Sequence, residues 1–115
     1  MDISIIRSPI KKEVLQEIAK IQFGDWVKAV VDIKRRVMAI GGDLHADEEA
    51  VLLDDGSKQQ DVWGINLWLE KDKDEWVQFN SMINIRPSQD NKSRSVENIS
   101  IQEDIKNIVD ELIIF

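Results

Sequence analysis

The sequence contains no cysteine. This absence excludes both a disulfide framework and a metal site built on thiolates, and nothing indicates adaptation to an oxidising compartment. No apolar run approaches membrane-spanning length, and residues 1–6 lack the basic stretch, apolar core and cleavage site of a signal peptide. We therefore expect a cytoplasmic protein with no membrane partner.

Recognised cofactor motifs are also missing. The chain has no Walker glycine loop, no G-x-G-x-x-G and no G-x-S-x-G pattern. The pair Gly41-Gly42 is by itself a weak signal for phosphate binding. We therefore expect no cofactor.

Positive charge is scarce. The chain carries 15 lysines and arginines against 22 aspartates and glutamates, a formal net charge of −7. This balance argues against general binding to nucleic acid, because such binding requires a basic surface. The charge is uneven, since residues 1–40 hold 8 basic and 5 acidic side chains. Specific nucleic-acid binding through Lys28 and the basic turn at residues 34–36 is therefore kept as a minority alternative.

The length and composition fit one globular domain spanning residues 1–115, with 43% hydrophobic and 32% charged residues. Periodicity predicts strands at residues 3–7, 26–33, 37–40, 63–69 and 76–86, and helices at residues 9–23, 43–53 and 100–113. Ser8 and Pro9 are expected to start the first helix, and a capping box from Ser100 the last. The order βαββαββα predicts an α+β fold, a mainly antiparallel sheet with helices packed on one face as a two-layer sandwich.

Alternation also predicts the register of the last hairpin. Leu67 and Leu69 share an apolar face with Val77 and Phe79 only if paired residue numbers have an even sum. This requires a loop of odd length, such as residues 72–74.

The face opposite the helices is predicted to be an interaction face. Its candidate residues are Asn66, Trp68, Trp76 and Asn84. Tryptophan favours interface centres and half-buried positions, so Trp68 and Trp76 are candidates for an exposed aromatic platform. A loop that covers this face would hide them equally well, and both alternatives stay open. Contact through this face would make the protein a homo-oligomer.

Asp43, His45 and Asp47 place two carboxylates and the only histidine of the chain within five residues. Such donors suit zinc or manganese, and a histidine also serves as a general base, so these are the weak catalytic candidates. The acids from Asp47 onward are equally explained as charges that stabilise the start of a helix. The structural interpretation is favoured, and no metal is predicted.

A second cluster lies at residues 86–94, where cations and hydroxyls gather in an otherwise acidic protein. Its candidate ligand-binding residues are Arg86, Ser88, Gln89, Asn91, Ser93 and Arg94. Guanidinium groups, hydroxyls and free backbone N–H groups are what an anionic ligand requires. The alternative is a solvated loop whose side chains satisfy its own backbone.

Three motifs resemble an uncharacterised prokaryotic family of small single-domain proteins. They are GGDLHADEE at residues 41–49, GSKQQDVWGINL at residues 56–67 and SMINIRPSQDNKSR at residues 81–94. The resemblance covers nearly the whole chain and implies a bacterial-type cytosolic protein. It implies no activity and no catalytic residue.

The leading hypothesis is a non-enzymatic binding or protein-interaction module that recognises a small anionic ligand through residues 86–94. The alternative is a small metal- or histidine-dependent hydrolase or transferase that uses residues 43–47. The position of His45 separates the two hypotheses. A concave pocket that holds His45 beside Arg86 or Arg94 favours the enzyme, and a His45 packed away excludes it.

Overall fold

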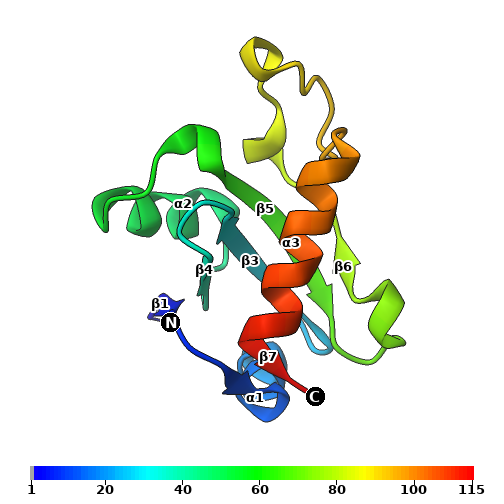
Figure 1. Ribbon diagram of the computed structural model, residues 1–115. Helices are drawn as coiled ribbons and strands as arrows, with labels where there is room; N and C mark the ends of the chain where they lie inside the picture. Colours follow the sequence, from blue (N-terminus) through cyan, green and yellow to red (C-terminus); the bar gives the residue numbers. More distant parts are fainter. Residues whose placement is uncertain (1) are drawn as a thin grey trace.

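The computed structural model describes residues 2–115, which contain a five-stranded sheet with helices on both of its faces (Figure 1). The sheet has the order β1-β4-β3-β5-β6, and every neighbouring pair is antiparallel. Its strands are β1 (Ser4–Ile6), β3 (Trp26–Asp32), β4 (Val37–Ile40), β5 (Val62–Trp68) and β6 (Val77–Gln78). The predicted α+β class and the mainly antiparallel sheet are confirmed.

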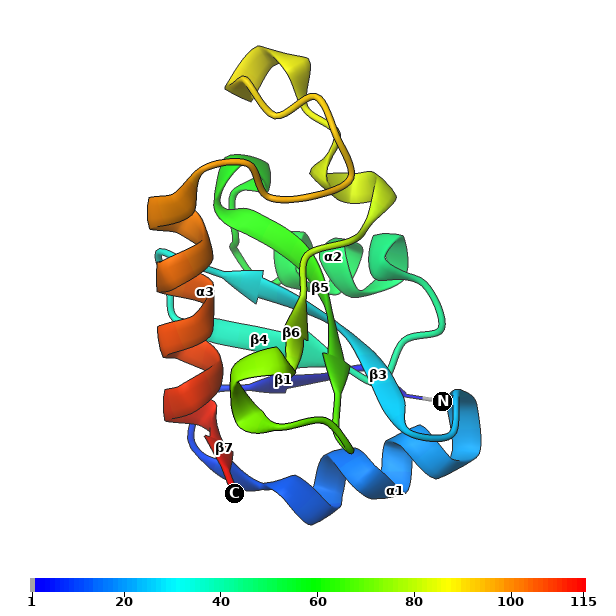
Figure 2. The ribbon, with the colours of Figure 1, turned by 90° about the vertical axis from the view of Figure 1, so that its right-hand side faces the viewer.

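The helices of the described chain lie on opposite sides of this sheet (Figure 2). They are α1 (Lys12–Gln22), α2 (His45–Asp54) and α3 (Ile99–Leu112). The larger core cluster joins Leu15 of α1 and Ile105 of α3 to Val31 in β3. The smaller cluster joins Leu52 of α2 to Val30, which points to the other face because side chains alternate along a strand. The prediction that all helices share one face therefore needs correction for α2, which adds a third layer.

The helix α1 begins later than predicted. Ser8 and Pro9 do not start it, because β2 (Ile10–Lys11) pairs in parallel with β7 (Ile113–Ile114) and keeps this stretch extended. The helix ends before Gly24, whose φ of +100° is the left-handed conformation expected of a terminating glycine. The β2–β7 pair fixes the start of α1 beside the end of α3.

The helix α3 has the predicted apolar stripe, and Ile105, Ile108, Val109 and Leu112 are all buried. Its cap is Asn98 rather than Ser100, since Asn98 Oδ1 accepts the Ser100 N–H at 2.9 Å. Among the helices of residues 2–115, none is both long enough and apolar enough to cross a bilayer.

The even sum predicted for the last hairpin is confirmed, because Leu67 pairs with Val77 and Asn66 pairs with Gln78, whereas the example loop of residues 72–74 would have paired Leu69 with Val77. The predicted strand is much shorter than expected, however, and β6 ends at Gln78. The loop that joins the two strands is therefore centred on residue 72, as the even sum requires.

Beyond β6 the chain folds over the second face of the sheet, the face that also carries α2. It does so through two 3₁₀ turns, η3 (Met82–Asn84) and η4 (Pro87–Gln89). Gly64 of β5 permits the crossing, since a Cβ at this position would lie 2.6 Å from the Cβ of Ser81. We call residues 81–97 the cover loop.

Candidate functional site

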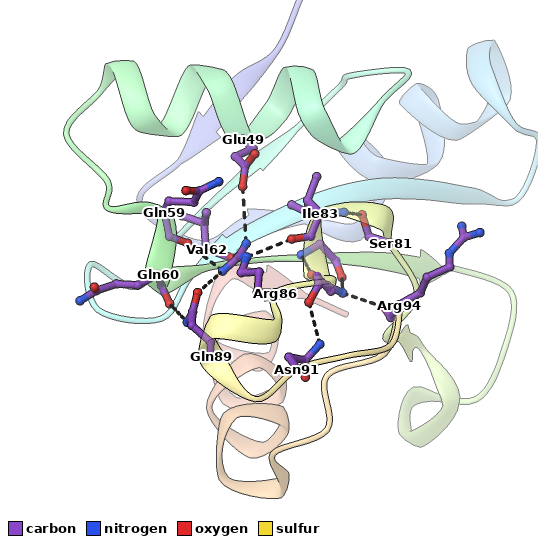
Figure 3. A network of polar contacts seen from close by, with 12 residues as sticks. Glu49, Gln59, Gln60, Val62, Ser81, Ile83, Arg86, Gln89, Asn91 and Arg94 are labelled. Carbon is purple, nitrogen blue, oxygen red and sulfur yellow. Dashed lines mark hydrogen bonds and ion pairs between the residues drawn. The ribbon is translucent and has the colours of Figure 1, made fainter.

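Arg86 holds the cover loop against the sheet (Figure 3). Its side chain is 8% exposed and donates hydrogen bonds to the backbone oxygens of Ile83, Gln59 and Val62. The guanidinium carbon also lies 4.6 Å from the centroid of the Trp63 ring. These contacts hold the guanidinium group inside the protein. Arg86 is therefore not accessible to a ligand, although the predicted ligand-binding role requires that it be.

Two buried asparagines complete this network. Asn84 exchanges hydrogen bonds with the backbone of Gly64, at 2.8 and 2.9 Å, and so takes the place of a neighbouring strand. Asn91 donates to the backbone oxygens of Asn84 and Ser95 and accepts the Glu97 N–H. An amide suits this role because it donates and accepts at once. Asn84 is therefore not part of an exposed interaction face, and Asn91 is occupied by the loop itself.

The remaining candidates of the cover loop divide into solvated groups and one free cation. Ser88 is exposed, Gln89 donates to backbone at 3.1 Å, and Ser93 donates to the Glu97 carboxylate at 2.9 Å. Arg94 is exposed, and within residues 2–115 its guanidinium forms no hydrogen bond or ion pair. Figure 3 shows its side chain pointing away from the Arg86 network. Of the two arginines predicted to bind an anion, only Arg94 is accessible.

His45 is packed against the sheet. It is 8% exposed, and its Nε2 lies 2.7 Å from the backbone oxygen of Ile65 in β5. Burial lowers the pKa of the imidazole, the hydrogen bond to Ile65 opposes this effect, and the cations Lys28 and Arg94 lower the pKa further. The ring is therefore neutral at pH 7, and Lys28 and Arg94 both lie close enough to act on it.

Residues 43–47 do not converge into a catalytic or metal-binding group. Asp43 and Asp47 are exposed, whereas His45 is directed into the fold. In the part of the chain that the structure describes, no three His, Cys, Asp or Glu side chains lie together so that they could hold a metal ion. This arrangement gives no support to the alternative of a metal- or histidine-dependent hydrolase or transferase.

Trp76 lies on the opposite side of the sheet from the predicted aromatic platform. It is 2% exposed and belongs to the larger core cluster. It follows a 3₁₀ turn, η2 (Lys73–Glu75), with helical angles of φ −64° and ψ −44°, and this conformation interrupts the alternation that predicted its direction. The prediction that Trp76 lies on the interaction face, opposite the helices, is wrong.

Trp68 belongs to a half-buried aromatic row. Its ring stacks on Trp26 with centroids 5.2 Å apart, and Trp26 stacks on Phe23 at 4.2 Å. Lys71 lies over Trp68 and Lys28 lies over Phe23, at 5.3 and 5.6 Å from the ring centroids. Sequence reasoning missed Phe23 and Trp26. Trp26 could have been found from the pairing of β3 with β5, because this pairing places it directly opposite Trp68.

Polar groups extend this row toward His45. Lys28 and Asn66 pair across β3 and β5, on the same face as the paired tryptophans. Asn66 donates to Gln78 Oε1 at 3.0 Å, and its own Oδ1 is buried on the side of His45, whose pKa the Asn66 side chain raises. We call this region, which α2 and the cover loop border, the sheet-end surface; it comprises Phe23, Trp26, Lys28, Asn66, Trp68, Gln78 and Arg94.

Glu48 is a fully buried acid close to Lys28. Burial raises its pKa to about 9, against the opposing effects of the Gly42 N–H and of the Lys28 charge. The Gly42 N–H donates to Glu48 Oε2 at 3.0 Å, and a Cβ at Gly42 would lie 2.7 Å from Glu48 Cγ. The carboxyl group is therefore protonated at pH 7 and does not neutralise Lys28.

The sheet-end surface thus carries positive charge that the protein does not neutralise by contact. Neither Lys28 nor Arg94 forms an ion pair with any carboxylate of residues 2–115. On the same face of the sheet lie flat aromatic rings and the amide oxygen of Asn66, which is buried on the side of His45. Such groups stack on rings, accept a hydrogen bond and bind anions.

Comparison with known proteins identifies one family. The model of the family described as a protein of unknown function (DUF5674) matches residues 4–112. No curated protein and no solved structure matches the chain significantly. The match confirms the resemblance to an uncharacterised family that the three motifs predicted. The cytoplasmic location, the prokaryotic origin and the homo-oligomer stay predictions.

Proposed function

We propose a function for this chain, which belongs to the DUF5674 family of proteins of unknown function: it is a non-enzymatic binding module for a small anionic ligand that contains a flat ring. The ligand would lie on the sheet-end surface. The observation that carries the proposal is that Lys28 and Arg94 lie near His45, on the sheet face that carries the stacked rings of Trp26 and Trp68, and form no ion pair with a carboxylate of residues 2–115.

The anionic part of the ligand is inferred from the two cations. Arg94 is exposed and offers a guanidinium fork, which suits a phosphate or a carboxylate. Lys28 is half-buried and adds a second positive charge. The neutral state of Glu48 supports this inference, because an ionised carboxylate beside Lys28 would repel an anion.

The flat part of the ligand is inferred from the aromatic row. Trp68 ends the row, and the ammonium of the exposed Lys71 lies 5.3 Å from the centroid of its ring. A planar group can replace this ammonium and stack on the indole.

Adenosine 5′-monophosphate is a suitable probe, because it joins an anion to a flat ring. We expect isothermal titration calorimetry to show saturable binding, with much weaker binding of ribose 5-phosphate and of adenosine. Arg94→Ala should raise the Kd about tenfold or more, since a charge-assisted hydrogen bond contributes about 1.5–3 kcal/mol. Trp68→Ala should raise it about tenfold, because stacking of one base contributes about 1–3 kcal/mol.

The matched control is Lys92→Ala, which removes an exposed cation two residues from Arg94. It should leave the Kd unchanged within about twofold, with circular dichroism as the check that each variant is folded. If Lys92→Ala weakened binding as much as Arg94→Ala, or if ribose 5-phosphate bound as tightly as the nucleotide, the proposal would be wrong.

A further inference from the structure

A second concave site lies on the other side of the sheet, between α3 and the hairpin that leads into β6. It is a groove of about 430 Å³, within the range of about 300–1,000 Å³ that is typical of small-molecule pockets. Residues of both α3 and β6 line it, and Figure 1 shows where these two elements lie. The sheet-end surface is on the opposite face, so the two sites share no residue.

The floor of the groove is apolar. Trp76, Val77, Val109 and Phe115 line it. The Phe115 ring lies against Trp76 with centroids 4.4 Å apart, yet Phe115 remains 49% exposed. A large apolar ring that is half-exposed beside a preformed groove gains free energy when a ligand covers it.

Lysine side chains surround this apolar floor. Lys73 and Lys106 line the groove, and Lys12 places its ammonium 5.4 Å from the centroid of the Trp76 ring. Lys73 Nζ lies 4.5 Å from the centroid of the Phe115 ring and 3.5 Å from Asp110 Oδ1. This ion pair links the hairpin before β6 to α3. That ion pair is exposed, so it contributes little and exchanges readily for another anion.

The lining itself holds two lysines and two aspartates, so the excess positive charge comes from Lys12, near the Trp76 ring. Asp110 lies on the wall next to Lys73, and Asp74 is the other acid of the lining. Within residues 2–115, Lys12 and Lys106 form no ion pair. An occupant must therefore present an apolar body to the floor and a negative group to these lysines.

We propose that this groove binds a small amphipathic anion, with an apolar body against Val77 and Phe115 and one carboxylate facing Lys106. Medium-chain fatty acids have this chemistry. A neutral molecule would leave the lysines unused, and a cationic amphiphile would be repelled by them. The inference does not depend on the function proposed for the sheet-end surface.

Octanoate is the probe, and octylammonium, with a comparable alkyl chain and the opposite charge, is its counterpart. Two-dimensional NMR titration should show saturable shifts of the backbone amides of Val77 and Lys106 with octanoate, and at least about tenfold weaker binding of octylammonium. Lys106→Met keeps the apolar stem of the side chain and removes its charge, so it should weaken octanoate binding about fivefold or more.

Two further variants separate this proposal from the first. Lys58→Met removes an exposed lysine elsewhere and should leave octanoate binding unchanged, as should Arg94→Ala. Lys106→Met should leave binding of the nucleotide unchanged. Equal binding of octylammonium, or octanoate binding that survives both Lys106→Met and Lys12→Met in folded protein, would overturn the assignment.

Discussion

Replacing Arg86 with methionine is expected to lower the free energy of unfolding by about 3 kcal/mol or more. The guanidinium donates to three backbone oxygens, those of Ile83, Gln59 and Val62, and methionine can donate to none of them. Each buried carbonyl oxygen left without a partner costs about 1–3 kcal/mol. Methionine retains an apolar stem beside Trp63, so the loss reports mainly on the hydrogen bonds.

Urea unfolding followed by far-UV circular dichroism measures this change. Arg94→Met is the matched control, because it is the same substitution in the same loop at an exposed position. It should change the free energy of unfolding by less than about 0.5 kcal/mol. Equal destabilisation by the two substitutions would contradict the structural role assigned to Arg86.

Glu48→Gln is expected to remove a pH dependence of stability on the order of 3 kcal/mol between pH 4.5 and pH 7. Burial raises the pKa of Glu48 from 4.5 to about 9 on folding. Between these two values the unfolded chain releases the proton while the folded protein keeps it, so the free energy of unfolding falls as pH rises. Glutamine cannot ionise, and its side-chain oxygen can still accept the Gly42 N–H.

The test compares urea unfolding of the two proteins at several pH values. Below pH 4.5 the carboxyl group is protonated in both states, so the difference between the proteins should be constant there. Above pH 4.5 the free energy of unfolding of wild type should fall steadily relative to that of the glutamine variant, as far as about pH 9. Glu103→Gln makes the same chemical change on the exposed surface of α3 and is the control. Parallel pH profiles for wild type and Glu48→Gln would show that the buried acid has no such effect.

The fold was predictable from the sequence wherever one face of an element is apolar and the other is polar. Alternation in β5 was strong enough to put Leu67 and Val77 on one face, although not to predict which residues pair, and the stripe of α3 marked its buried face. The face of the sheet that α2 covers was not predictable, because this helix buries His45 and Glu48 beside Leu52. A pattern of apolar residues cannot reveal a helix face that is mostly polar.

The candidate site was predictable only in part, for a related reason. Arg86 and Arg94 lie in the same polar segment, and nothing in the sequence around them indicates which one is buried. The crossing of the cover loop over Gly64 buries Arg86 and leaves Arg94 exposed. Trp68 was identified, but its neighbour Phe23 is distant in sequence and reaches the row through Trp26. Burial and long-range stacking depend on tertiary contacts that local periodicity does not contain.

The pairing of β2 with β7 also constrains the order in which the protein can assemble. It joins Ile10 to Ile113, and contacts between such distant residues form slowly, because closing a long loop costs entropy before the contact stabilises the chain. The helix α1 follows β2 directly and shares a core cluster with α3. During synthesis, β2 therefore cannot pair with β7 until Ile113 has left the ribosome, whereas α1 can pack against β3 earlier.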